Sequence, residues 1–99
     1  MPKAELLIRQ RDELPNDILI EIKIWQLPQS DPERPHGLKY SLYCGQNGKR
    51  LVGYDNERGK GDHRHIKTRE EAYVFNTLEQ LIQDFYSDAF RMIRELNDE

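Results

Sequence analysis

Four isoleucines at every second position constrain the fold of this chain more than any other feature. They are Ile18, Ile20, Ile22 and Ile24, and the charged residues Glu21 and Lys23 lie between the last three. Successive side chains of a strand point to opposite faces, and β-branched residues favour strands, so this segment predicts a strand with one apolar face. Such a face has to be buried against another element of the fold.

A matching apolar stripe occurs near the end of the chain. Thr77 and Gln80 form a capping-box pattern, with Thr77 as the N-cap and Gln80 as its reciprocal partner. Apolar residues then recur at helical spacing at Leu78, Leu81, Ile82, Phe85, Ala89, Met92, Ile93 and Leu96. We therefore predict one long helix, which buries Leu81, Ile82, Phe85, Ala89 and Met92 against Ile20, Ile22, Ile24, Tyr40 and Leu42.

Shorter alternating segments predict the other strands. Residues 4–9 and 38–44 alternate, and Asn47-Gly48 favours a hairpin turn into a strand over residues 51–55. Residues 63–66 are expected to be extended and residues 72–75 to form a last short strand, whereas prolines make residues 28–37 a loop. The predicted fold class is α+β: a curved antiparallel β-sheet with one long C-terminal amphipathic helix packed on it, as a single domain over residues 1–99.

Charge is distributed unevenly along the chain. The net charge is -3, yet residues 49–69 hold seven Lys/Arg and three acids, whereas the remainder holds eight Lys/Arg and fifteen acids. A basic segment on an acidic body can bind a polyanion at one place. The single cysteine, Cys44, lies in an alternating apolar run and is expected in the core. With no signal-peptide or membrane-span pattern, we expect a cytoplasmic protein.

Residues 55–65 hold three acids, two histidines, three cations and two glycines, without an aliphatic side chain. Loops on a rigid scaffold often supply binding and catalytic groups, so this segment is the predicted site for a phosphate. His63 and His65 would point the same way in an extended segment, roughly 6.6 Å apart at their Cα atoms. One could take a proton from a 2′-hydroxyl and the other could give a proton to the leaving 5′-oxygen. The predicted catalytic residues are His63, His65, Lys60, Glu57 and Asp62.

The glycines around Lys60 suggest a way to hold the phosphate. Glycine permits backbone angles that aim successive N–H groups into one concavity. Tyr54 could stack on a base or donate its hydroxyl, although a half-buried strand aromatic is an equally good interpretation. The predicted substrate-binding residues are Tyr54, Asp55, Arg58, Gly59, Gly61, Arg64, Lys67 and Arg69.

The same segment permits metal chemistry. A His-x-His pair on a strand can bind zinc with a carboxylate as third ligand, and carboxylates alone can hold magnesium. Three cations among the same residues oppose a dication, so the sequence favours acid–base chemistry without a metal or other cofactor. Asp55 and Asp62 can also simply orient a histidine or pair with Arg58 and Arg64.

The segment YDNERGKGDHRH, residues 54–65, resembles the signature of the TumE family of small bacterial toxins. Similar flanking segments are Lys3–Leu7, Ile24–Pro28, Lys39-Tyr40, Tyr73–Phe75 and Asp84-Phe85. The resemblance covers nearly the whole chain. It implies a toxin from a two-gene toxin–antitoxin pair, with a helix-turn-helix antitoxin as partner. An oligomer could form through the complex with the antitoxin.

Together these features predict a toxin that acts on RNA as a metal-independent endoribonuclease. Two alternatives stay open at this point. The first is a metal-dependent nuclease or phosphotransferase built from the same segment, which a divalent-metal requirement would favour. The second is a non-catalytic module that binds a nucleic acid or a protein partner, which binding without turnover would favour.

Overall fold

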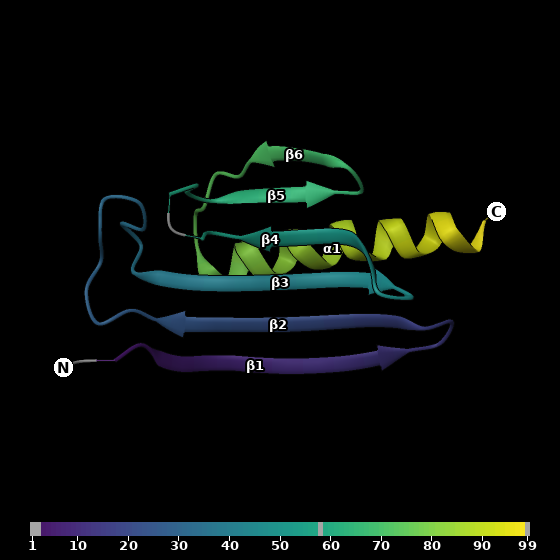
Figure 1. Cartoon of the computed structure of the whole chain (residues 1–99), viewed down its shortest axis with the longest axis horizontal. Helices are drawn as coiled ribbons and strands as arrows, with labels where there is room; N and C mark the ends of the chain where they lie inside the picture. Colours follow the sequence, from purple (N-terminus) through teal and green to yellow (C-terminus); the bar gives the residue numbers. More distant parts are fainter. Residues whose placement is uncertain (1–2, 58, 99) are drawn as a thin grey trace.

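The computed structural model describes residues 3–57 and 59–98, and in this part of the chain it shows six strands and one helix. Each strand pairs antiparallel with its neighbour in sequence, so the sheet order is β1-β2-β3-β4-β5-β6 (Figure 1). The elements are β1 Glu5–Leu14, β2 Ile18–Gln26, β3 Leu38–Gln46, β4 Lys49–Asp55, β5 His63–Ile66, β6 Arg69–Ala72 and α1 Leu78–Asn97.

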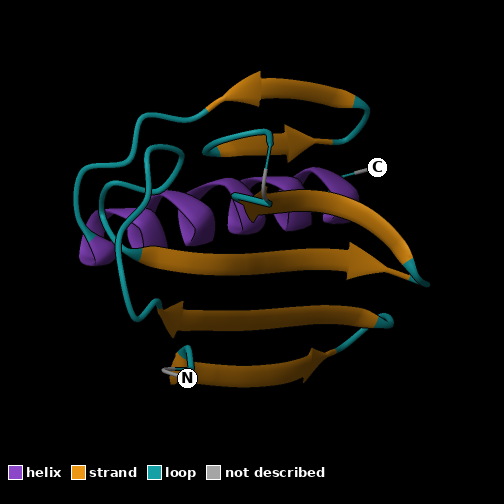
Figure 2. Cartoon of the chain, turned by 60° about the vertical axis from the view of Figure 1, so that its left-hand side comes forward, coloured by secondary structure: helices purple, strands orange, loops and turns teal. Residues whose placement is uncertain are grey.

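The sheet has one face packed on the helix and one face without a helix (Figure 2). We call them the closed face and the open face. Ile22, Leu42 and Tyr54 occupy paired positions on the closed face and are fully buried. Lys23 and Ser41 are paired at intervening positions, on the open face. The predicted α+β fold with one C-terminal helix on a curved antiparallel sheet is confirmed.

The core lies between the closed face and α1, as the two periodicities predicted. Leu81, Phe85 and Ala89 are fully buried on the helix side, and Met92 is nearly so. Ile82 is only partly buried at the margin of this core. Cys44 is a buried free thiol whose pKa is raised to about 11 by burial, in agreement with the expected core role.

Two hairpin turns set the register of the first four strands. Asn16 and Asp17 have φ values of 68° and 61°, and Asn47 and Gly48 have φ values of 53° and 78°. Two consecutive residues with positive φ are typical of the type I′ turn, which matches the twist of the flanking strands. The Asn47-Gly48 turn was predicted. Strand β1 continues to Leu14, at the first hairpin turn, whereas the predicted strand covered residues 4–9.

The helix cap is confirmed only in part. The side-chain oxygen of Thr77 accepts a hydrogen bond of 3.0 Å from the backbone N–H of Gln80. The side chain of Gln80 instead donates to Asp84 at 2.7 Å. The N-cap prediction is therefore right, whereas the reciprocal contact of a capping box is replaced by a pair along the helix.

The predicted strand over residues 72–75 is wrong, because β6 ends at Ala72. A tight turn at Lys67, where φ is 56°, sends the chain back early and pairs Ala72 with His63. The N–H of Tyr73 then donates to the carbonyl of Asp62 at 3.1 Å, and the chain crosses toward the helix. Within residues 3–57 and 59–98, no helix is long and apolar enough to cross a membrane.

Candidate functional site

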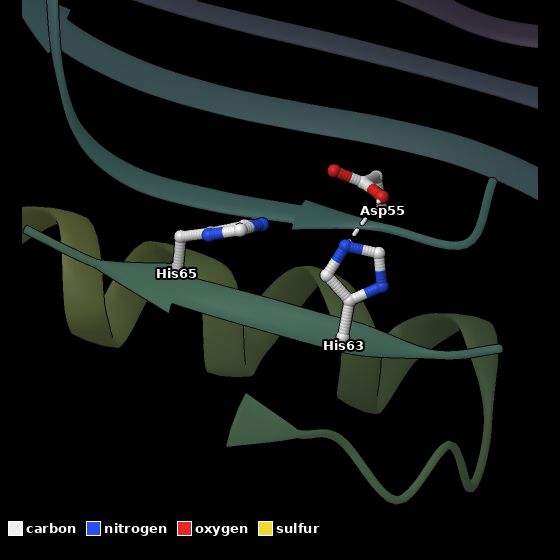
Figure 3. Close-up of side chains that lie close together, drawn as sticks. All are labelled: Asp55, His63 and His65. Atoms are coloured by element: carbon white, nitrogen blue, oxygen red, sulfur yellow. Dashed lines mark ion pairs between the residues drawn. The ribbon is translucent and has the colours of Figure 1, made fainter. Parts of the chain in front are cut away.

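Asp55, His63 and His65 lie together on the open face, and we call them the open-face cluster (Figure 3). One ligand atom from each lies within 4.8 Å of the other two. Asp55 ends β4 and is paired with His63, which begins β5. Because strand side chains alternate, His65 points to the same face as His63, as its spacing predicted. The two histidines thus belong to a strand and not to a loop.

His63 is held through both of its ring nitrogens, and its side chain is 6% exposed. Nδ1 lies 3.0 Å from the carbonyl oxygen of Gly61, and Nε2 lies 2.8 Å from Oδ1 of Asp55. A carbonyl only accepts, so a proton on Nδ1 is donated to Gly61. An ionised carboxylate also only accepts. A neutral ring has one proton and can donate to only one of these two acceptors, so both contacts are attractive together only when both nitrogens carry protons or when a cation lies beside one of them.

His65 stands beside His63, with ring centroids 5.1 Å apart and an interplanar angle of 78°. Burial lowers the pKa of His65, and the positive charge of Arg50 lowers it further. Arg50 reaches this position because Gly53, paired with His65, has no side chain. A Cβ atom on Gly53 would lie 2.9 Å from Cδ of Arg50. The open face therefore offers one neutral imidazole next to an arginine.

The segment around Gly59, Lys60 and Gly61, which we call the glycine loop, has the predicted positive φ angles, but one of its N–H groups already binds a carboxylate. Gly59 and Gly61 have φ values of 90° and 69°. The N–H of Gly59 donates to Oε2 of Glu33 at 2.7 Å, and the N–H of Lys60 donates to the Glu57 carbonyl at 3.2 Å. A carboxylate oxygen thus lies where an anionic phosphate oxygen was expected. Arg58, also predicted for this site, lies outside the described residues.

Asp62 does not join the open-face cluster. Its Oδ1 accepts a hydrogen bond of 2.7 Å from the hydroxyl of Tyr40 and lies 3.0 Å from Nε2 of His36. The backbone N–H of Leu38 donates to Nδ1 of His36 at 3.2 Å, so Nε2 is the protonated nitrogen. The His36 ring also packs against Phe75, with centroids 4.0 Å apart. Asp62 therefore fastens the loop between β2 and β3 to the start of β5.

Tyr54 and Arg64 are also turned away from the cluster. The hydroxyl of Tyr54 donates to Oδ2 of Asp88 on α1, and Arg64 lies 3.2 Å from that same carboxylate oxygen. Nε of Arg64 donates to Glu71 at 2.9 Å. The Tyr54 ring is fully buried, which corrects the expectation that it stacks on a base. The two residues join the sheet to the helix.

Three further predicted residues lie apart from the histidines. Lys67 is in the turn after β5, with Nζ 3.7 Å from Glu95 on the helix. Arg69 begins β6 and is exposed, 3.9 Å from Glu71. The side chain of Glu57 is exposed at the start of the glycine loop. None of these positions brings a side chain into the Asp55, His63 and His65 group that the described residues form.

The sequence interpretation missed Glu70, Arg50 and His36. Glu70 is paired with His65 across the last hairpin, and its Oε1 lies 3.8 Å from Nε2 of His63. Strand alternation from the tight turn would have placed Glu70 on the open face, once that turn was recognised. His36 gives no such signal, since it lies in an irregular loop and reaches Asp62 only through the tertiary fold.

Comparison with known proteins gives one finding. A family model described as Toxin TumE matches residues 3–96, which includes the whole sheet and nearly all of the helix. No curated protein and no solved structure matches the chain.

Proposed function

This chain belongs to the TumE family of toxins, and from that premise we propose that it is the toxin of a toxin–antitoxin pair and that it cleaves RNA. The observation that carries the cleavage proposal is the imidazole pair of His63 and His65. The two rings lie 5.1 Å apart on the open face, and they differ in how their nitrogens are bonded. Two imidazoles in different states are what a proton-transfer reaction at one phosphate requires.

In the proposed reaction, His65 is the general base. Within the described residues, no hydrogen bond occupies its ring nitrogens, so one of them is free to take the proton of a ribose 2′-hydroxyl. The 2′-oxygen then attacks the adjacent phosphorus atom, and the bond to the 5′-oxygen breaks. His63 gives its Nε2 proton to that leaving oxygen, while Asp55 and Gly61 hold the ring in place. The products are a 2′,3′-cyclic phosphate and a 5′-hydroxyl.

The glycine loop and the nearby cations are the proposed phosphate binders. The N–H of Gly59 already binds an oxyanion, the carboxylate of Glu33, at 2.7 Å. A phosphate oxygen of RNA would replace that carboxylate, with the exposed Lys60 alongside. Arg50 lies over Gly53 next to His65, where it can stabilise charge that develops on the reacting phosphate.

The partner that we propose is a helix-turn-helix antitoxin, with both proteins acting in the cytoplasm. The residues outside the segment 49–69 carry eight Lys/Arg and fifteen acids, and so present an acidic body. This body leaves the basic segment as the place for RNA and offers a separate surface to the antitoxin.

RNA cleavage by the purified full chain tests this proposal. Synthetic RNA is incubated with the wild type, His63→Ala or His65→Ala in the presence of EDTA, and products are identified by mass spectrometry. We expect cyclic phosphate ends from the wild type and about a 10²–10⁴-fold loss of rate in each variant, the usual contribution of one acid or base. Induced expression should inhibit growth with the wild type only.

Arg11→Ala is the matched surface control, since Arg11 on β1 is 58% exposed, pairs with Glu21 and lies outside the basic segment. Its cleavage rate should equal that of the wild type. A variant that lacks both histidines but still cleaves RNA and stops growth would refute the proposal. RNA binding without cleavage would support the non-catalytic alternative.

A further inference from the structure

The two ring nitrogens of His63 face two acceptors, the Gly61 carbonyl and the Asp55 carboxylate. When Nδ1 donates its proton to the Gly61 carbonyl, at 3.0 Å, Nε2 of the neutral ring carries a lone pair. That lone pair faces Oδ1 of Asp55 at 2.8 Å. Either a proton or a metal ion between the two atoms turns this repulsion into attraction. A histidine that donates its second nitrogen to a backbone carbonyl is the usual arrangement of a metal ligand.

A fourth donor approaches the same point from the neighbouring strand. Oε1 of Glu70 lies 3.8 Å from Nε2 of His63 and 4.0 Å from Nε2 of His65. Zinc bonds of about 2.0–2.1 Å place tetrahedral ligand atoms about 3.3 Å apart. The distances in the protein lie on both sides of that value. Small side-chain rotations are therefore enough to bring the four donors around one ion.

The composition of this donor set selects the kind of ion. Two imidazole nitrogens and two carboxylate oxygens suit zinc and its transition-metal neighbours, whereas magnesium and calcium prefer oxygen ligands alone. The two carboxylates of Asp55 and Glu70 balance the charge of a dication. Arg50 is the nearby opposing charge, and its exposed side chain lies over Gly53.

We infer that Asp55, His63, His65 and Glu70 bind one transition-metal dication, with Zn²⁺ as the best fit. Binding does not depend on the reaction proposed above, but its effect does. A bound Zn²⁺ occupies the nitrogens that would accept and donate protons, so it switches off the metal-independent cleavage.

Titration calorimetry of the full chain without an affinity tag tests the site. Zn²⁺ should bind at one ion per chain, and Co²⁺ should give visible absorption bands typical of four-coordinate geometry. His65→Ala and Asp55→Asn should weaken Zn²⁺ binding at least about 100-fold, more than the usual effect of a residue behind the ligands. Absence of Zn²⁺ binding at this ratio, or unchanged binding in both variants, would overturn the inference.

Glu70 and Glu71 provide a matched pair, because they are neighbours in β6 with the same charge but opposite faces. Glu70 approaches the histidines, whereas Glu71 binds Arg64 on the closed face. Glu70→Gln should weaken Zn²⁺ binding about tenfold or more, and Glu71→Gln should change it less than about twofold. Equal weakening by both changes would reduce the effect to general charge and overturn the inference.

Cleavage assays with added Zn²⁺ separate this inference from the proposed function. Inhibition by one equivalent of Zn²⁺, relieved by EDTA, supports both. Cleavage that requires the bound Zn²⁺ supports the metal site and overturns the metal-independent reaction. Zn²⁺ binding in a protein that never cleaves RNA supports the site and overturns the proposed reaction.

Discussion

Among the described residues, two histidine–aspartate pairs are alike in distance and differ in their chemical surroundings. Nε2 of His36 lies 3.0 Å from Asp62, and Nε2 of His63 lies 2.8 Å from Asp55. His36 receives a hydrogen bond on Nδ1 and donates from Nε2, so a neutral ring satisfies every partner. His63 faces an acceptor on each side.

This difference distinguishes a structural contact from a reactive one. The His36–Asp62 pair is complete without an added charge, and Tyr40 and Phe75 enclose it. The His63 ring faces an acceptor at each of its nitrogens and lies next to a second imidazole. The histidine–aspartate distances do not distinguish the two pairs. The partner of the other ring nitrogen does, because it is a donor for His36 and an acceptor for His63.

The largest expected effect concerns Asp55, whose carboxylate keeps the proton of His63 in place. Asp55→Asn should lower RNA cleavage by about 10²-fold, the scale of losing one general acid. Because the asparagine side chain has nearly the same size and shape, the free energy of unfolding should change by less than about 1 kcal/mol. Initial cleavage rates and urea denaturation measure the two effects. An unchanged rate would show that the two pairs are equivalent.

The corresponding change in the other pair should act on stability. Asp62→Ala leaves the Tyr40 hydroxyl and the His36 N–H without their acceptor in a buried place. The free energy of unfolding should fall by about 1–3 kcal/mol, the usual penalty for an unsatisfied buried group. Urea denaturation with a constant m-value checks this. A smaller loss than in Asp55→Ala would contradict the assignment of the structural role.

Two arginines extend the comparison from the pairs to the faces of the sheet. Arg64 bonds to Asp88 and Glu71, so Arg64→Ala should cost about 1–3 kcal/mol of stability. Arg50→Ala should leave stability within about 0.5 kcal/mol and reduce the salt slope of RNA binding by about 0.7, one contact on a single strand. Binding measured across a salt series decides this, and an unchanged slope would remove Arg50 from the RNA site.

The smallest expected effect needs no substitution. Nitrogen-15 spectra of the histidine rings should show a proton on Nε2 of His36 and none on its Nδ1, because the Leu38 amide donates to Nδ1. A proton on Nδ1 of His36 would contradict the structural role given to its pair with Asp62.

Much of the fold follows from local patterns, whereas only part of the site does. Period two in β2 and period 3.6 in α1 predict the core, and alternation alone places His63 and His65 on one face. The same alternation puts Arg64 on the closed face. It was nevertheless predicted to bind substrate, because it lies in the basic segment. Contacts of Glu33 and His36 with the glycine loop could not be predicted, because they join segments through an irregular loop.

The order of the strands has a consequence for synthesis on the ribosome. Each strand pairs with the one made just before it, and Asp55, His63 and His65 come from a single hairpin. Such local pairing forms early. The helix that covers Ile20, Ile22 and Ile24 starts only at residue 78, after all six strands described here. A chain interrupted before that point would display a bare apolar sheet, a template for aggregation and not a finished toxin.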